Sequence, residues 1–349
     1  MRIVGTSTAF PQHYFPQAAV VGALKEYWGQ SPEQSAVLER LHGRTGVEGR
    51  HFCFPLERYK ELDTWGKRND AWIHFATCLG QQAVRKALQR ANLASERLGA
   101  IFFTSVTGIA SPSIDALLIN RMQLPLNIRR IPIFGLGCVA GAAGIARAAD
   151  YVRAYPEQVA LLLSVELCSL TWQMDDTSVA NLISAGLFGD GSAAVLVAGQ
   201  KTALPGVEII ASESAFFPNT EDIMGWDISE AGFNIVLSAD VPKIVRYYMG
   251  TSVDAFLANQ GLSRSDIGSW IMHTGGPKVL EATEKVLDLP EGALDASWSC
   301  LRRAGNLSSA SVLMVLDEVM AKRRPAPGTL SILAAMGPGF CAEMVLLRW

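Results

Sequence analysis

The chain has 349 residues, of which 49% are hydrophobic and 18% are charged. So large an apolar fraction, with a mean hydropathy of +0.21, excludes a disordered chain and indicates a large core. The net charge of −3 gives no basic excess of the kind that binds nucleic acid. Six cysteines are too few for a disulfide scaffold, and no Cys-x-x-Cys pair indicates a metal site.

The beginning of the chain and its apolar runs predict a cytoplasmic protein. The first residues enter strand-like sequence directly, without the charged and then apolar leader of a secreted protein. The most apolar run, residues 159–165, ends at Glu166, well short of the ~18 residues that a membrane span needs. We therefore expect a soluble chain with reduced thiols and no stable membrane insertion.

Short β-rich runs alternate with longer helical stretches, which is typical of an α/β fold. This order of elements occurs twice. A helical stretch near residues 70–92 precedes a strand at residues 100–104. A second helical stretch near residues 240–260 precedes a strand at residues 269–273. Two further pairs of predicted strands continue the repeat: residues 159–166 with 328–335, and residues 192–197 with 342–347.

These matches indicate an internal duplication, with halves at residues 1–203 and 204–349. A helix rich in small residues begins just after Cys138, and another begins at the corresponding Asn306. A pseudo-two-fold axis between duplicated halves brings corresponding helix starts together. We therefore expect Cys138 and Asn306 to be neighbours, although they are far apart in the sequence.

Cys138 follows a predicted strand and a glycine turn, and a helix begins at or just after it. The positive end of a helix dipole lowers the pKa of a thiol and increases the supply of nucleophilic thiolate. The other five cysteines lack this setting. The alternative is a buried, inert cysteine, which is common for this residue type.

A histidine and an asparagine in the second half could act with Cys138. His273 ends a β-rich run and precedes a glycine turn, where α/β sheets often hold ligands and catalysts. A hydrogen-bonded structural histidine is the alternative. Asn306 precedes an apolar helix and, taken alone, is best interpreted as an N-cap. Opposite a candidate nucleophile, its amide could instead donate a hydrogen bond to a substrate.

These three residue types together suit one kind of chemistry. A thiolate beside an imidazolium is an activated nucleophile for an acyl group. A histidine and an asparagine amide are both donors, and two donors can hold the oxygen of a forming enolate. The set therefore favours carbon–carbon bond formation on thioesters.

Other interpretations also fit part of the pattern. Residues 135–141 (GLGCVAG) imitate a dinucleotide-binding fingerprint, but the spacing differs and a glycine pattern alone is weak. A papain-like hydrolase also combines Cys, His and Asn at a similar spacing, although Cys138 lacks the sequence context of that family. A structural α/β protein without activity is a further alternative.

Five motifs occur in order along the chain: GLGCVAG at 135–141, LFGDGSAA at 187–194, HTGGP at 273–277, GNLSS at 305–309 and GPGF at 337–340. They resemble the type III polyketide synthases, the chalcone and stilbene synthase-like branch of the thiolase-fold enzymes, over nearly the whole chain. The resemblance implies a thiolase-like αβαβα five-layered fold with two duplicated halves. It also implies a homodimer that needs no carrier protein, cofactor or metal.

The resemblance implies a division of labour among the site residues. An acyl-CoA starter would load on Cys138, and malonyl-CoA would lose CO2 against His273 and Asn306 before repeated Claisen condensation. Phe188 matches the gatekeeper between the CoA tunnel and the cavity. Phe233 resembles a second gatekeeper, although an aromatic residue here could equally belong to the core. Gly337 and Pro338 of the GPGF loop are also expected at the substrate.

Within the family, residues 165–171, 225–228 and 339–349 look like the bacterial alkylpyrone and alkylresorcinol synthases. Those enzymes take medium- to long-chain fatty acyl starters. Cys168 stands where plant members have threonine, and we expect it to line the cavity with Thr171 rather than act as a nucleophile. Where plant members carry a methionine that reaches across the dimer, this chain has Ser111 before Pro112.

CoA needs basic residues at a tunnel mouth, and the candidates are Arg44, Arg50 and Lys278. The alternative within the fold is a 3-oxoacyl synthase III-type enzyme, which uses malonyl groups on a carrier protein. The GPGF loop and Phe188 favour the polyketide interpretation. The sequence does not determine the starter length, the number of extensions, or closure to a pyrone or a resorcinol.

Overall fold

The computed structural model describes residues 1–29 and 31–349, and it centres on a nine-stranded sheet with the order β11-β12-β13-β8-β1-β7-β6-β4-β5. Its strands are β1 (Arg2–Ala9), β4 (Leu98–Thr104), β5 (Arg129–Ile133), β6 (Val159–Leu167), β7 (Asp190–Ala198), β8 (Val207–Phe216), β11 (Ile267–Met272), β12 (Leu330–Gly337) and β13 (Cys341–Arg348).

The strand directions repeat in the two halves. In the first half, β4 runs parallel to β6, β6 antiparallel to β7, and β7 antiparallel to β1. In the second half, β11 runs parallel to β12, β12 antiparallel to β13, and β13 antiparallel to β8. The halves join where β1 pairs with β8, through Arg2 with Glu208 and Ile3 with Val207. The predicted duplication is therefore confirmed.

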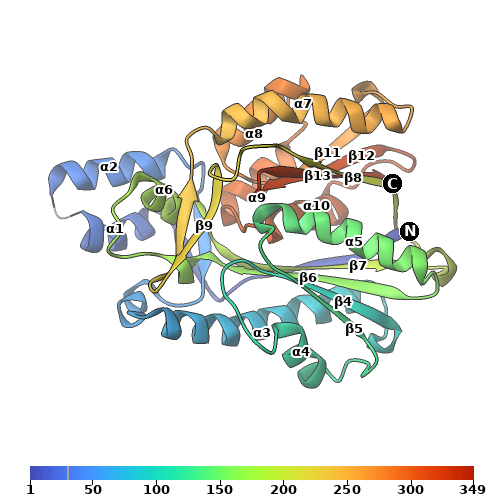
Figure 1. Ribbon diagram of the computed structural model, residues 1–349, viewed down its shortest axis with the longest axis horizontal. Helices are drawn as coiled ribbons and strands as arrows, with labels where there is room; N and C mark the ends of the chain where they lie inside the picture. Colours follow the sequence, from blue (N-terminus) through green and yellow to red (C-terminus); the bar gives the residue numbers. More distant parts are fainter. Residues whose placement is uncertain (30) are drawn as a thin grey trace.

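Helices cover both faces of each half-sheet, which gives five layers (Figure 1). From bottom to top of the figure, the helical layers are α3 (Trp65–Arg90) with α4 (Ile114–Met122), α5 (Ala140–Ala154) with α10 (Ala310–Lys322), and α7 (Val241–Asn259) with α8 (Pro277–Leu287). The middle helices approach closely, because a Cβ atom at Gly141 would lie 2.3 Å from the Ser309 carbonyl oxygen. The predicted αβαβα arrangement is confirmed.

Three hydrophobic cores fill the space between the half-sheets and the helices that cover them. Along β6, Leu161 and Leu163 face the core between α3 and the sheet, whereas Ala160 and Leu162 face the middle layer. A strand that is covered on both faces is apolar on both faces, which explains the continuous apolar run in this segment. The third core lies between α7 and the second half-sheet.

The remaining elements gather at one end of the layers, to the left in Figure 1. They are α1 (Gln17–Trp28), α2 (Pro32–Gly43), α6 (Val179–Leu187), α9 (Asp295–Ala304) and the strand pairs β2 (His13–Pro16) with β3 (Gly49–Phe52) and β9 (Met224–Ser229) with β10 (Gly232–Leu237). No helix in the described part of the chain is both long and apolar enough to cross a membrane.

Candidate active site

Glycines allow two loops to meet at Cys138. A 3₁₀ turn (Gly137–Val139) carries Cys138 from β5 into α5. Gly137 has a φ of +53°, and a Cβ atom there would lie 2.6 Å from the Pro338 ring. A Cβ atom at Gly337 would lie 2.6 Å from the Leu136 carbonyl oxygen. The GPGF loop therefore supports the cysteine turn directly, which explains why both loops contain glycine.

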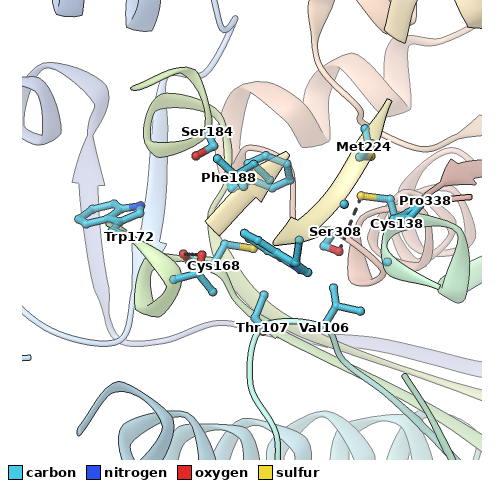
Figure 2. Close-up of a pocket in the computed structure, with 15 residues that line it drawn as sticks. Val106, Thr107, Cys138, Cys168, Trp172, Ser184, Phe188, Met224, Ser308 and Pro338 are labelled. Atoms are coloured by element: carbon cyan, nitrogen blue, oxygen red, sulfur yellow. Dashed lines mark hydrogen bonds between the residues drawn. The ribbon is translucent and has the colours of Figure 1, made fainter. Parts of the chain in front are cut away.

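Cys138 is buried, and its thiol donates a hydrogen bond to Ser308 Oγ at 3.7 Å (Figure 2). Burial raises the pKa of Cys138 to about 12, while hydrogen bonds with Ser308 and Asn306 lower it and the charge of Glu166 raises it further. The expectation of a lowered thiol pKa is therefore wrong for this site. Removal of the sulfur from water outweighs the helix dipole, and α5 itself begins only at Ala140.

Asn306 lies beside Cys138, as the duplication predicts. Its side-chain oxygen accepts hydrogen bonds from the Ser308 backbone N–H at 2.8 Å and from Ser311 Oγ at 3.2 Å. These two donors fix the amide so that its NH2 group is left to interact with the Cys138 sulfur, whose pKa it lowers. The N-cap of α10 is Ser309, so the alternative role of Asn306 as an N-cap is wrong.

His273 follows β11, and its backbone N–H donates to Ala334 in β12 at 3.0 Å. The side chain is 6% exposed, and its Nδ1 has no hydrogen-bond partner among the described residues. Burial lowers the pKa of His273 to about 4, so the imidazole is neutral at pH 7. In this buried setting both the thiol and the imidazole are neutral, whereas the sequence predicted an imidazolium.

A cavity opens in front of Cys138, with about 510 Å³ of empty space that includes open solvent (Figure 2). Four of the expected residues besides Cys138 line it: Cys168, Thr171, Phe188 and Pro338. Sequence reasoning missed the other side chains that line it: Val106, Thr107, Trp172, Ser184, Met224, Trp226, Ile235 and Ser308. These residues come from several separate segments, and no local motif marks them as neighbours.

Phe233 occupies a different place from Phe188. It lies edge-on to Trp65 and Trp226, with ring centroids 6.2 and 5.7 Å away, and it is 3% exposed. It lines a smaller space of about 210 Å³ that shares Thr107 and Thr171 with the main cavity. Within β10 it is Ile235, two residues further along, that lines the main cavity.

The three basic candidates for CoA binding differ in exposure. Arg44 at the end of α2 and Lys278 in the first turn of α8 are exposed. Arg50 is completely buried, and its guanidinium donates to the carbonyl oxygens of Ala185 and Phe188. The expectation that Arg50 binds CoA at a tunnel mouth is therefore wrong, because the side chain is fully buried and its Nη1 and Nη2 donate to partners within the protein.

Glu166 is a buried carboxylate that the sequence marked only as the end of an apolar run. It accepts hydrogen bonds from Ser309 Oγ, from Thr107 Oγ1 at 3.0 Å and from the Val106 N–H at 3.1 Å. Burial raises the pKa of Glu166, and these hydrogen bonds act in the opposite direction. Glu166 thus ties the start of α10 to the loop that forms one wall of the cavity.

A duplicated five-layered α/β fold, with a cysteine and an asparagine meeting between its two middle helices, defines the thiolase-like class of proteins. The comparison with known families is more specific. Residues 2–201 match the N-terminal domain and residues 208–349 the C-terminal domain of the chalcone and stilbene synthases. The chain therefore belongs to this family of type III polyketide synthases, transferases that condense malonyl units.

Bacterial relatives match over nearly their whole length. The 1,3,6,8-tetrahydroxynaphthalene synthase of Streptomyces peucetius subsp. caesius is 45% identical, over 99% of this chain and 93% of the relative. The phloroglucinol synthase of Pseudomonas fluorescens is 34% identical, over 97% of each chain. The crystal structure of the Streptomyces coelicolor tetrahydroxynaphthalene synthase superposes with a TM-score of 0.95 at 33% identity, covering 100% of this chain and 99% of that one.

Proposed function

We propose that the protein loads an acyl-CoA starter on Cys138 and extends it with malonyl-CoA by decarboxylative Claisen condensation. The observation that carries this proposal is the fixed amide of Asn306. Its oxygen is held by two donors while its NH2 group lies beside the Cys138 sulfur and lowers the pKa of the thiol. A donor in this place can stabilise the enolate oxygen that forms when malonyl-CoA loses CO2.

Loading requires the transfer of one proton. The neutral imidazole of His273 accepts the thiol proton of Cys138 as the sulfur attacks the thioester carbonyl. CoA leaves as a thiolate and takes this proton, so that the acyl-enzyme and free CoA remain. The imidazole of His273 is neutral at pH 7, because burial lowers its pKa to about 4, and a neutral ring nitrogen can accept a proton.

Extension uses the same side chains in another way. Malonyl-CoA loses CO2, and the electron pair of the broken bond forms an enolate whose oxygen accepts from the Asn306 NH2 group and the His273 N–H. The enolate carbon attacks the acyl carbonyl on Cys138 and the sulfur leaves as a thiolate. The product is a CoA thioester that is longer by two carbons, ready for reloading or cyclisation.

The cavity favours an apolar starter. No described residue that lines it is charged, and Trp172, Trp226 and Ile235 form much of its wall. Such a lining suits an alkyl chain, which gains free energy when it leaves water. We therefore propose a medium- to long-chain fatty acyl-CoA starter, with an alkylpyrone or alkylresorcinol product.

The relatives favour a second candidate. The names tetrahydroxynaphthalene synthase and phloroglucinol synthase describe hydroxylated aromatic products without an alkyl tail. At 45% identity to one of these proteins, the chain could use malonyl-CoA as both starter and extender.

One set of incubations separates these candidates. The purified protein is given malonyl-CoA alone, or malonyl-CoA with fatty acyl-CoAs of increasing length, and products are identified by mass spectrometry. Alkylpyrones or alkylresorcinols that appear only with acyl-CoA support the first candidate, and hydroxylated aromatics from malonyl-CoA alone support the second. Activity that requires malonyl groups on a carrier protein, or steady release of free acid without malonyl-CoA, would contradict both.

We further propose a cytoplasmic homodimer that uses no cofactor and binds CoA through Arg44 and Lys278. Both side chains are exposed, as phosphate-binding groups at a tunnel mouth must be. Replacing either with alanine should raise KM for acyl-CoA while kcat is retained. The oligomeric state is measured by light scattering on the purified protein.

A further inference from the structure

Arg50 holds an unusual position for a charged side chain. It is 0% exposed, and its Nη1 donates to the carbonyl oxygens of Ala185 at 2.7 Å and Phe188 at 2.6 Å. Its Nη2 donates to Gln17 Oε1 at 2.9 Å. A charge that is buried mainly among neutral acceptors costs free energy, so these contacts need an explanation.

The contacts complete the C-terminal end of α6. A helix leaves its last carbonyl groups without partners inside the helix. At residues 185–188 each of these groups has a donor from another part of the chain. The donors are Arg50 Nη1 for Ala185 and Phe188, Gln17 Nε2 for Gly186 at 2.8 Å, and the Asn306 N–H for Leu187 at 2.9 Å. A cation is also favourable at this negative end of the helix.

Asn306 belongs to the same unit. Besides its bond to Leu187, its carbonyl oxygen accepts from the Gly189 N–H at 2.9 Å. The preceding Gly305 packs on the stem of Arg50, because a Cβ atom there would lie 3.0 Å from Arg50 Cδ. The Arg50 side chain thus contacts the segment that carries Phe188 through its guanidinium and the segment that carries Asn306 through its stem.

Cys138 depends on different contacts. Its turn is supported by Gly337 and Pro338, and its thiol by Ser308. None of the hydrogen bonds described for Arg50 reaches that turn. The side chains that would handle malonyl-CoA therefore depend on Arg50, whereas the nucleophile does not.

We propose that Arg50 is a positioning residue that fixes Phe188 and Asn306 relative to Cys138, and thereby controls condensation rather than starter loading. The inference rests on the proposed function. The planar guanidinium of Arg50 holds two carbonyl groups through Nη1 and Gln17 through Nη2, and the single nitrogen of lysine does not reproduce this arrangement. A displacement of about 1 Å of a group at a reacting centre can cost roughly 100-fold in rate.

The test compares Arg50→Met, Arg50→Lys and Gln17→Met with a matched control, Arg90→Met. Arg90 also donates to a backbone carbonyl, that of Thr6, and pairs with Asp317, but it contacts no residue of the site. Starter loading is measured by intact-protein mass after incubation with acyl-CoA alone. Condensation is measured as kcat and KM with malonyl-CoA, and stability as Tm.

Arg50→Met is expected to load starter normally, while kcat for condensation falls by roughly 100-fold and KM for malonyl-CoA changes little. Arg50→Lys should recover part of the loss, and Gln17→Met should show a smaller loss of the same kind. Arg90→Met should lower Tm without changing the ratio of loading to condensation. Equal losses of loading and condensation in Arg50→Met, or a raised KM with unchanged kcat, would overturn the proposal.

Hydrogen exchange gives a readout that does not depend on activity. Peptides that cover residues 179–189 and residues 305–309 should exchange faster together in Arg50→Met and stay unchanged in Arg90→Met. Exchange that is unaltered at either segment would refute the coupling. If the wild-type protein itself fails to condense malonyl units, the proposed function fails, and this experiment still decides the positioning role.

Discussion

At the scale of single residues, Asp190 shows how burial alters a side chain near the cavity. Its carboxylate accepts from the Cys53 N–H at 2.9 Å, from the Ser169 N–H at 2.8 Å and from Ser169 Oγ at 2.6 Å. Burial raises the pKa of Asp190 to about 6, and these hydrogen bonds limit the shift. Asp190 thus holds Ser169, which directly follows Cys168 in the wall of the cavity.

This raised pKa predicts a pH dependence of stability. The folded state holds the Asp190 proton more tightly than the unfolded state. The protonated Asp190 therefore contributes fully to the free energy of unfolding below about pH 4, and this contribution is lost as pH rises through about 6. The difference in Tm between wild type and Asp190→Asn should therefore change between about pH 4 and 6 and stay constant at higher pH. A difference that is constant throughout would show that the pKa of Asp190 is not raised.

The sequence predicted Cys138, His273 and Asn306 as site residues because each lies in a local pattern of strand, glycine turn and helix. It failed for Arg50, because the same local sequence allows an exposed or a buried arginine and only the path of α6 decides between them. It also missed Glu166, whose partners Thr107 and Ser309 come from distant segments. Local sequence therefore does not predict which distant side chains surround a candidate site residue.

At the scale of elements, glycines determine how closely the segments of the site approach each other. Gly305 ends α9 with a φ of +72° and a ψ of −162°, a conformation almost restricted to glycine. A Cβ atom there would lie 2.4 Å from the Leu187 carbonyl oxygen. Gly305 thus allows α9 to lead into Asn306 directly against the end of α6.

Gly305→Ala should lower stability and also reduce condensation. Backbone strain alone costs about 1–3 kcal/mol, and the clash with Leu187 displaces Asn306. Gly328→Ala is the matched control, since Gly328 has a φ of +87° with no atom within 4 Å of the added Cβ. Denaturant unfolding and product formation are measured for both variants. If the two variants lose condensation equally, the approach of Leu187 to Gly305 does not matter for the site.

At the scale of the whole molecule, the middle layer joins the two halves. Its core combines Ala142 and Ile145 from α5 with Val312 and Leu316 from α10. The repeat of predicted strands was sufficient to predict this layered arrangement, because the hydrophobic runs of both half-sheets are visible in the sequence. The volume and lining of the cavity could not be predicted, because they depend on loops that meet only after both halves have folded.

This shared core predicts that the halves do not fold separately. Residues 1–203 expressed alone should expose the middle layer and lack a cooperative thermal transition, because α5 would lose its packing against α10. Co-expression with residues 204–349 should recover a soluble, cooperatively unfolding complex. A cooperative transition for residues 1–203 alone would instead make the first half an independent domain.

The central claim is that Asn306 and His273 serve malonyl decarboxylation while Cys138 carries the acyl chain. The most direct test is Asn306→Asp, with Asn120→Asp on the exposed surface of α4 as the control and Cys138→Ala as the variant that cannot load. Acylated protein mass and CO2 release from labelled malonyl-CoA are measured on the same samples. We predict that Asn306→Asp keeps loading but loses CO2 release on the order of 100-fold, because a carboxylate repels the enolate oxygen. Equal loss of both steps, or CO2 release that stays at the level of Asn120→Asp, would contradict the account.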